Sequence, residues 1–430
     1  MKLIFNQFFA KLNKANIPYA ITGRTELYPD NIHSDIDIII PTNRFSDFWE
    51  FMRLLKDVEI SWVQIISHEA KAHFCVITAS NGIKHDKMMP DVCADYFRNG
   101  SLFLKADYLL VNRVLTSKGF YVLAPEKEFV YYILKKIDKG SLDADQYIHL
   151  KEQWELDPKK CLASITPYFS KKSLVIIQNI FKDSSNEVIF QNNISNLKND
   201  LHQNLNFNVF YFLSRIKNRI LRILKTTGLV IAFMGPDGSG KTTIINGMKD
   251  NLSGIFRQHK QYHLFPKEGI GAPPTIDPHS QKARGFFGSL AKLFYFLGLY
   301  SIGYWLKIYP LKIKSTLVIF DRYYHDILVD PKRYRNGTSQ FWTKLIGYMI
   351  PKPDVWILLD VPGDVIQKRK AEVTPAESKR QVLAYQDLFK TLKNGVVING
   401  NQIPSKVVYD TEQVIINYLK VRTAKRYKNK

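Results

Sequence analysis

The chain has 430 residues, of which 61 are Lys or Arg and 39 are Asp or Glu, so its formal net charge is +22. It is 45% hydrophobic and 13% aromatic, which is too apolar for an intrinsically disordered chain, and its three cysteines are too few for a disulfide scaffold or a thiolate zinc cluster. The length suggests roughly two or three domains, and the positive charge favours a phosphate, nucleotide, nucleic acid or anionic membrane surface as partner.

Residues 1–18 interrupt their apolar run with Asn and Lys, a pattern unlike that of a signal peptide. Because the cysteines are also sparse, we expect a cytoplasmic protein in a reducing compartment. Peripheral contact with the inner face of a membrane stays open here, since surplus positive charge also attracts anionic lipid.

Changes in residue pattern divide the chain into parts. Short helix and strand signals alternate over residues 1–145, residues 146–226 are polar and helical, and residues 227–420 alternate β-branched runs with helical stretches. Strands that alternate with helices are typical of βαβ units around a parallel sheet. We therefore predict an N-terminal α+β domain, a helical connector, a C-terminal α/β domain with a parallel sheet, and a basic tail over residues 421–430.

Two aspartates open an apolar strand near the N-terminus. Asp35 and Asp37 flank Ile36, and a strand places side chains two positions apart on one face, so both carboxylates point the same way. Carboxylates held this close repel each other unless a divalent cation lies between them. A third acid, Asp91 or the competing Asp86, would complete a set that holds two Mg²⁺ ions for in-line nucleotidyl transfer.

Residues 1–140, approximately, resemble the nucleotidyltransferase superfamily related to DNA polymerase β, whose signature is glycine-serine, a spacer and Asp-x-Asp. Arg24 follows the signature glycine where that family places a small serine, so either Arg24 holds a phosphate or the pocket no longer admits a triphosphate. The alternative is a degenerate domain that only binds. The resemblance assigns nucleotide binding to Gly23 and Arg24, and metal binding to Asp35, Asp37 and Asp91.

Residues 207–225 combine apolar side chains at helical spacing with several Lys and Arg residues. The same pattern suits a connecting helix that packs on one domain and a helix that lies on anionic lipid. We interpret the segment as a connecting helix, with the membrane-surface role as the alternative.

The sequence from Gly235 to Thr242 fits the G-x-x-x-x-G-K-[ST] phosphate loop. An apolar strand at residues 229–234 precedes it and a helical run follows, which is the context that this loop needs. The glycines let backbone N–H groups surround the β- and γ-phosphates, Lys241 adds positive charge, and the Thr242 hydroxyl is offered to Mg²⁺. The residues assigned to nucleotide binding on this basis are Gly235, Gly238, Ser239, Gly240, Lys241, Thr242 and Thr243.

Two later segments add charged side chains. A buried strand ends in Asp321 and Arg322, at the edge where open α/β sheets bind ligands, so Asp321 would position Mg²⁺-bound water or the acceptor and Arg322 would clamp an acceptor phosphate. Arg369 and Arg380 follow the next strand, on a segment that can close over phosphates and stabilise transition-state charge. The alternatives are a strand-end salt bridge for the first pair and a solvated face for the second.

Over about residues 228–418 the chain resembles thymidylate kinases and their nucleoside-monophosphate kinase relatives, through GPDGSGKTT, FDRYYHD, and PKPDVWILLDVP followed by IQKRKAE. The resemblance implies transfer of the γ-phosphoryl group of ATP to an acceptor, with Mg²⁺. By the same resemblance, Asp237 binds within the phosphate loop and contacts the acceptor sugar, and the catalytic residues are Lys241, Asp321, Arg322 and Arg369.

Two departures from that family fall on the acceptor side. Thymidylate kinases carry an Arg-Glu-Pro-Gly-type segment where this chain has HLFPK from His263, and the apolar segment 285–310 is longer than a compact thymidylate kinase needs. Because Lys292 and several glycines interrupt it, we expect that segment to be a buried or groove-lining helix and not a membrane span. The closer resemblance is to thymidylate-kinase-like proteins of bacterial surface-polysaccharide gene clusters.

The leading hypothesis is therefore an ATP-dependent phosphotransferase that acts on a nucleoside monophosphate (dTMP-like) or related acceptor, with the activity of the N-terminal domain left open. One alternative is a kinase and nucleotidyltransferase that acts on a sugar or polysaccharide precursor. Another is a nucleotide-gated binding protein with a degenerate N-terminal domain. We expect small phosphorylated or sugar partners and no nucleic acid, because no basic and aromatic nucleic-acid module is recognisable; a homo-oligomer stays open.

Overall fold

The computed structural model describes residues 1–32, 34–55, 60–67, 71–182, 187–266 and 282–427. The chain divides into two compact units. Unit 1 comprises residues 1–81, 86–222 and 426–430, and unit 2 comprises residues 82–85 and 223–425.

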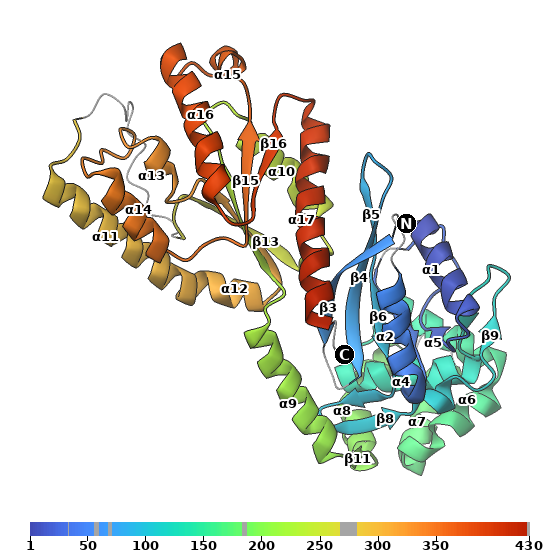
Figure 1. The fold of residues 1–430 in the computed structure, drawn as a ribbon. Coiled ribbons are helices and arrows are strands. Elements are labelled where there is room, and N and C mark those ends of the chain that lie inside the picture. The colour runs from blue at the N-terminus through green and yellow to red at the C-terminus, as the bar shows by residue number, and fades with distance from the viewer. Residues whose placement is uncertain (33, 56–59, 68–70, 183–186, 267–281, 428–430) are drawn as a thin grey trace. The chain divides into compact units, whose positions relative to one another are not determined.

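The main sheet of unit 1 has the strand order β3-β4-β6-β2-β1-β10-β9, with β5 paired to β4 (Figure 1). Its strands are β1 (Ala20–Ile21), β2 (Ile36–Ile39), β3 (Ile60–Ser67), β4 (Ala72–Ser80), β5 (His85–Met88), β6 (Pro90–Cys93), β9 (Val114–Leu115) and β10 (Tyr121–Val122). A smaller sheet joins β7 (Tyr96–Arg98), β8 (Ser101–Leu104) and β11 (Asn206–Phe207). Strands β2 and β6 are parallel, and their register places Asp37 beside Asp91.

The two faces of this sheet pack in different hydrophobic cores. Ile36 and Ile38 of β2 lie in a core with Phe8 and Phe48 of the helices α1 (Lys2–Lys14) and α2 (Phe45–Leu54). Ile39 lies instead in the core built on helix α4 (Pro125–Lys139). Since alternate residues of a strand face opposite sides, the face that carries Asp37 is the face that α4 covers.

Residues 146–226, set apart above as a helical connector, mostly pack within unit 1. Up to Leu205, their apolar side chains join the core of α4, because each helix presents a single apolar face. Helix α9 (Val209–Leu224) buries none of its residues in the described structure and leaves apolar side chains such as Phe210 exposed, so it does not pack on one domain in the way expected of a connecting helix. The helices of this part of unit 1 are α3 (Ala106–Leu109), α5 (Ala144–Leu156), α6 (Pro158–Ile165), η2 (Thr166–Tyr168), α7 (Lys171–Lys182), α8 (Glu187–Gln203) and α9 (Val209–Leu224), the last of which reaches the boundary of unit 2; η1 (Thr42–Arg44) precedes α2.

Unit 2 is built on a parallel five-stranded sheet with the order β13-β14-β12-β15-β16. Its strands are β12 (Leu229–Met234), β13 (Gln258–His263), β14 (Thr316–Asp321), β15 (Val355–Asp360) and β16 (Gly395–Asn399). Its helices are α10 (Lys241–Asn251), α11 (Phe286–Gly303), η3 (Tyr304–Ile308), α12 (Tyr309–Ile313), α13 (Asp326–Val329), α14 (Gln340–Met349), α15 (Gly363–Arg369), α16 (Pro375–Thr391) and α17 (Pro404–Tyr427). The predicted fold class, an α/β domain with a parallel sheet together with an N-terminal α+β domain, is confirmed.

The apolar segment and the basic tail differ in part from expectation. Among the described residues, one helical segment, Phe286–Ile313, is long and apolar enough to cross a membrane, a property that core helices of soluble proteins share. Phe296 packs in the core of unit 2 whereas Trp305 is exposed, so the expected burial holds along one face only. Helix α17 continues through residues 421–427 of the predicted basic tail.

Two glycines of unit 2 give a matched test of its backbone packing. A β-carbon at Gly228 would lie 2.6 Å from Cα of Lys312 and 2.7 Å from the carbonyl oxygen of Thr316, whereas one at Gly298 on α11 would meet nothing within 4 Å. We expect Gly228→Ala to lower the free energy of unfolding by about 1–3 kcal/mol, because backbone atoms must move. Gly298→Ala should leave it unchanged or raise it by up to about 1 kcal/mol, because alanine favours helices. Urea unfolding followed by circular dichroism measures both, and equal midpoints would contradict the close approach.

Candidate active sites

The phosphate-loop sequence forms a turn between β12 and α10. Gly235, Gly238 and Gly240 have φ angles of +137°, +82° and +91°, a region that other residues rarely adopt. The loop therefore needs its glycines for its backbone path. Helix α10 begins at Lys241, so its free N–H groups face the loop, as a phosphate site requires.

Lys241 is buried inside this loop, with 6% of its surface exposed. Its ammonium donates to the carbonyl oxygens of Gly235 and Pro236, both at 2.8 Å, and lies 3.4 Å from Oγ of Ser239. Burial, followed by the positive charge of Arg322, lowers the pKa of Lys241 to about 8. The side chains of Thr242 and Thr243 are exposed on the first turn of α10.

Arg322 and Arg333 hold Asp237 of the phosphate loop between them, each bonded to a different carboxylate oxygen. Burial of Asp237 opposes its ionisation, but the charges of Arg322 and Arg333 outweigh burial, so the pKa of this carboxyl lies well below its usual range. Arg322 also donates to the fully buried Asp326 at 2.5 Å, which accepts hydrogen bonds from the hydroxyls of Tyr334 and Tyr385. This buried network fixes the guanidinium, and the backbone of Arg322 takes a φ of +78°, a strained value for arginine.

Asp321 ends β14 beside Phe233 of β12, at the edge where the phosphate loop begins. Among the described residues, its buried Oδ1 has no hydrogen-bond partner. The structure therefore places Lys241, Asp237, Asp321 and Arg322 around one edge of the sheet. Asp326 ends the FDRYYHD segment that carries the resemblance, but the sequence assigned it no role. The sequence did not indicate Arg333, which lies in a short basic run that alone indicates only a charged surface.

In the segment expected to close over phosphates, the two predicted arginines do not contact the phosphate loop in the described structure. Arg369 is exposed at the end of α15, and Arg380 bonds to Glu377 and to the carbonyl oxygen of Val329. Lys370, which follows Arg369 in the same basic run, lies nearer the loop, because a β-carbon at Gly238 would be 3.2 Å from Cβ of Lys370. A small cavity of about 10 Å³ lies between these segments. Lys267, the last residue of the HLFPK segment, lies outside the described residues.

In unit 1, Asp35, Asp37 and Asp91 form a cluster whose nearest carboxylate oxygens all lie within 4.8 Å of one another. The parallel register of β2 and β6 brings Asp91 beside Asp37. Asp86 lies instead 3.1 Å from the N-terminal amine. Of the two candidates for a third acid, Asp91 is therefore the one that joins the pair.

The pKa values of Asp91 and Lys135 in and beside this cluster are shifted from their usual ranges. Burial, followed by repulsion from Asp37, raises the pKa of Asp91 to about 7. Lys135 of α4, which the sequence did not indicate, lies 2.6 Å from Asp37; burial opposes its charge, but Asp37 outweighs burial and raises the pKa of this ammonium above its usual range. Such a set of acids favours a divalent cation, because an ion would relieve their mutual repulsion.

The acidic cluster lies in a cavity of about 670 Å³ with a basic wall. Burial, followed by the nearby charge of Lys139, lowers the pKa of Lys136 to about 8, so this wall favours an anionic ligand. The cations of the wall other than Lys135 are Arg98, Lys136, Lys139, Arg215, Arg219 and Arg222.

Gly23 and Arg24 do not line this cavity as described. Gly23 has a φ of +91°, and its N–H donates to Oε1 of Glu128 at 2.8 Å. The exposed Arg24 lies 3.9 Å from Asp145 at the start of α5. The structure thus gives Gly23 a role in the loop backbone and directs Arg24 towards α5, not towards the acidic cluster.

Comparison with known proteins relates part of the chain to one family. Residues 233–415 match the family model of thymidylate kinase. A probable thymidylate kinase 1 of Saccharolobus solfataricus is 31% identical over 202 residues, which cover 43% of this chain and 96% of that protein. A probable thymidylate kinase of Pyrobaculum aerophilum is 24% identical over 198 residues, 43% of this chain and 95% of that protein. A crystal structure of thymidylate kinase from Ehrlichia chaffeensis covers 44% of this chain and 97% of its own, with 20% identity and a TM-score of 0.32.

The lowered pKa of Lys241 predicts a pH dependence of ATP binding. Because bound phosphates favour the protonated ammonium, affinity should fall as pH rises above about 8, by about tenfold at pH 9. Lys241→Arg keeps its charge over this range, so its affinity should stay level. Calorimetric titration from pH 7 to 9 measures both proteins, and equal slopes would show that another group titrates.

Proposed function

Because the chain belongs to the thymidylate kinase family through its C-terminal unit, we propose that unit 2 transfers the γ-phosphoryl group of ATP to a nucleoside monophosphate of the dTMP type. The observation that carries this proposal is the convergence of Lys241, Asp237 and Arg322 with Asp321 at one edge of a parallel sheet. A glycine-turned loop and a helix N-terminus supply N–H groups for the β- and γ-phosphates.

The donors and charges of this site suit phosphoryl transfer, whose catalysis rests on positioning and electrostatic stabilisation. Lys241 would exchange the loop carbonyls for phosphate oxygens, and Arg322, held by Asp326, would present a fixed guanidinium to the acceptor phosphate. Asp237 would give up its ion pair with one of the two arginines and accept a hydrogen bond from a hydroxyl of the acceptor sugar.

The residues beside the loop also suit Mg²⁺. Asp321 offers a carboxylate oxygen without a hydrogen-bond partner among the described residues, and Thr242 offers an exposed hydroxyl. Both are hard oxygen ligands of the kind that Mg²⁺ prefers. When bound, the ion would neutralise charge on the phosphates, while the protein groups above orient them.

The acceptor is tested with a panel that includes dTMP, other nucleoside monophosphates and sugar phosphates. A sugar-type acceptor remains the alternative, because the departures at His263 and over residues 285–310 fall on the acceptor side. Greatest turnover with a sugar phosphate would support that alternative, and greatest turnover with dTMP would support the proposal above.

Lys241→Ala should lower kcat/KM for phosphoryl transfer by at least ~100-fold, because the transferring group loses a preorganised charge. Lys249→Ala is the matched control: it lies on the same helix and contacts Gln261 and Asn246. A coupled assay of ADP release measures both. Wild-type turnover in Lys241→Ala would remove the kinase proposal, and equal loss in Lys249→Ala would show a general effect on the helix.

We also propose that unit 1 binds two Mg²⁺ ions at Asp35, Asp37 and Asp91 and transfers a nucleotidyl group to a small acceptor. The supporting observation is the acidic cluster beneath a cationic wall in a cavity of about 670 Å³. The acids suit the metal ions, and the wall suits a triphosphate, whose negative charges would lie against it. A domain that binds without transferring is the alternative, because Arg24 stands in place of the signature serine.

Asp35→Asn should weaken Mn²⁺ binding at this site at least tenfold and abolish transfer of labelled nucleotide, because it removes one ligand charge. Asp86→Asn is the control, since Asp86 lies at the N-terminal amine and outside the cluster. Electron paramagnetic resonance measures bound Mn²⁺, and thin-layer separation measures transfer. Metal binding without transfer across a broad donor panel would support the binding-only alternative, and unchanged Mn²⁺ affinity in Asp35→Asn would refute the site.

A further inference from the structure

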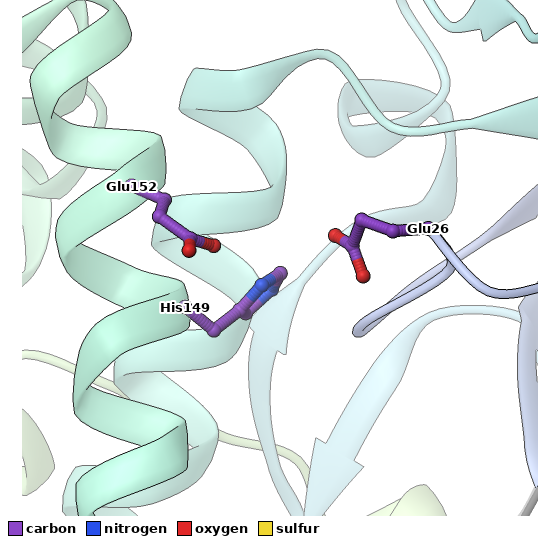
Figure 2. Close-up of side chains that lie close together, drawn as sticks. All are labelled: Glu26, His149 and Glu152. Carbon is purple, nitrogen blue, oxygen red and sulfur yellow. The ribbon is translucent and has the colours of Figure 1, made fainter.

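A second cluster of ligand-type side chains lies in unit 1, apart from the three aspartates. Glu26 comes from the loop between β1 and β2, and His149 and Glu152 lie one turn apart on α5. One potential ligand atom from each residue lies within 4.8 Å of the others. Figure 2 shows the imidazole of His149 between the carboxylates of Glu26 and Glu152.

Glu128 orients the imidazole of His149 by a hydrogen bond at Nε2. Oε1 of Glu128 accepts the N–H of Gly23 at 2.8 Å and lies 3.0 Å from Nε2 of His149. Since a carboxylate only accepts, Nε2 carries the proton of this hydrogen bond, and Nδ1 of the neutral imidazole then carries the lone pair. The ring of Tyr132 packs edge-on against the imidazole, with centroids 4.9 Å apart, and restricts its rotation.

The lone pair on Nδ1 is buried and has no hydrogen-bond partner among the described residues, and His149 is only 2% exposed. A buried acceptor without a donor costs free energy, so this atom favours a partner that accepts its lone pair. Two neighbouring carboxylates add negative charge to the same place. A divalent cation would accept the lone pair of Nδ1 and also neutralise the two carboxylates.

We propose that Nδ1 of His149 and the carboxylates of Glu26 and Glu152 bind a divalent transition-metal ion of the Zn²⁺ type. A metal-binding histidine usually donates the N–H of its second ring nitrogen to a carboxylate, and Glu128 supplies that carboxylate. The imidazole nitrogen favours Zn²⁺ over Mg²⁺ or Ca²⁺, which prefer oxygen ligands throughout. Three protein ligands leave a position for water or a substrate group.

The ion would join α5 to the loop between β1 and β2. Arg24 of this loop already lies 3.9 Å from Asp145 of α5, so the loop and the helix meet at a second point. The same loop leads to Asp35 of the acidic cluster. Binding at the new site would therefore restrain the segment that carries a ligand of the other site.

The test counts zinc bound to the full chain after dialysis against Zn²⁺ with excess Mg²⁺, by mass spectrometry of the metal. Wild type should retain about one tightly bound Zn²⁺, and Glu26→Gln and Glu152→Gln should each weaken binding by about tenfold or more. Glu155→Gln is the matched control on the same helix, where Glu155 lies 3.8 Å from Lys151, and it should bind as wild type does. Asp35→Asn should also keep this zinc, because its carboxylate belongs to the other cluster.

Co²⁺ titration supplies a second readout that does not depend on activity. The visible absorption of Co²⁺ bound to the wild-type chain should change in Glu152→Gln and disappear in His149→Gln. Should His149→Gln fail to fold, Glu26→Gln and Glu152→Gln still decide the matter, because both side chains are exposed. Zinc retained equally by wild type and a Glu26→Gln/Glu152→Gln double variant, or zinc lost only with Asp35→Asn, would overturn the proposal.

Discussion

Parallel strand pairing is the constraint on which both candidate active sites depend. Parallel strands begin at one edge of a sheet and end at the opposite edge, so residues distant in the chain meet at either edge without any motif that links them. In unit 1 this pairing brings Asp91 of β6 beside Asp37 of β2. In unit 2 it sets Asp321 of β14 beside β12, whose end leads into the phosphate loop. Each unit thus gathers charged side chains at one edge of its sheet.

Some of the buried charged side chains at these sites have partners of opposite charge among the described residues, and others do not. Arg322 is nearly inaccessible to solvent but lies between Asp237 and Asp326, so its charge is satisfied within the protein. Burial of Asp91, followed by repulsion from Asp37, raises the pKa of Asp91 to about 7. Groups of the first kind hold the geometry of a site, and groups of the second kind favour a ligand of opposite charge.

The site chemistry that the sequence predicted is the chemistry carried by local motifs. The phosphate loop could be recognised because its glycines, lysine and threonine are contiguous and lie between a strand and a helix. The pair Asp35 and Asp37 could be recognised because alternation along a strand places both on one face. Neither inference needed any knowledge of distant residues.

Several contacts could not be predicted in this way. Arg333 is held at Asp237 and Lys135 at Asp37, each across a long stretch of sequence. Glu128 of α4 lies against His149 of the next helix, α5, a contact that depends on how the two helices pack. Residues 146–205 have the pattern of independent helices, yet they pack in the core of unit 1, because an amphipathic face does not indicate which surface it will bury against.

The sequence by itself determined the phosphate loop, the paired aspartates and the succession of strands and helices, because these follow from spacing between near neighbours. Only the tertiary structure decided which third acid lies beside Asp35 and Asp37, which arginines bind Asp237, and which ring nitrogen of His149 lacks a partner among the described residues. Those outcomes depend on strand register and on helix packing, which bring together atoms that no local pattern relates.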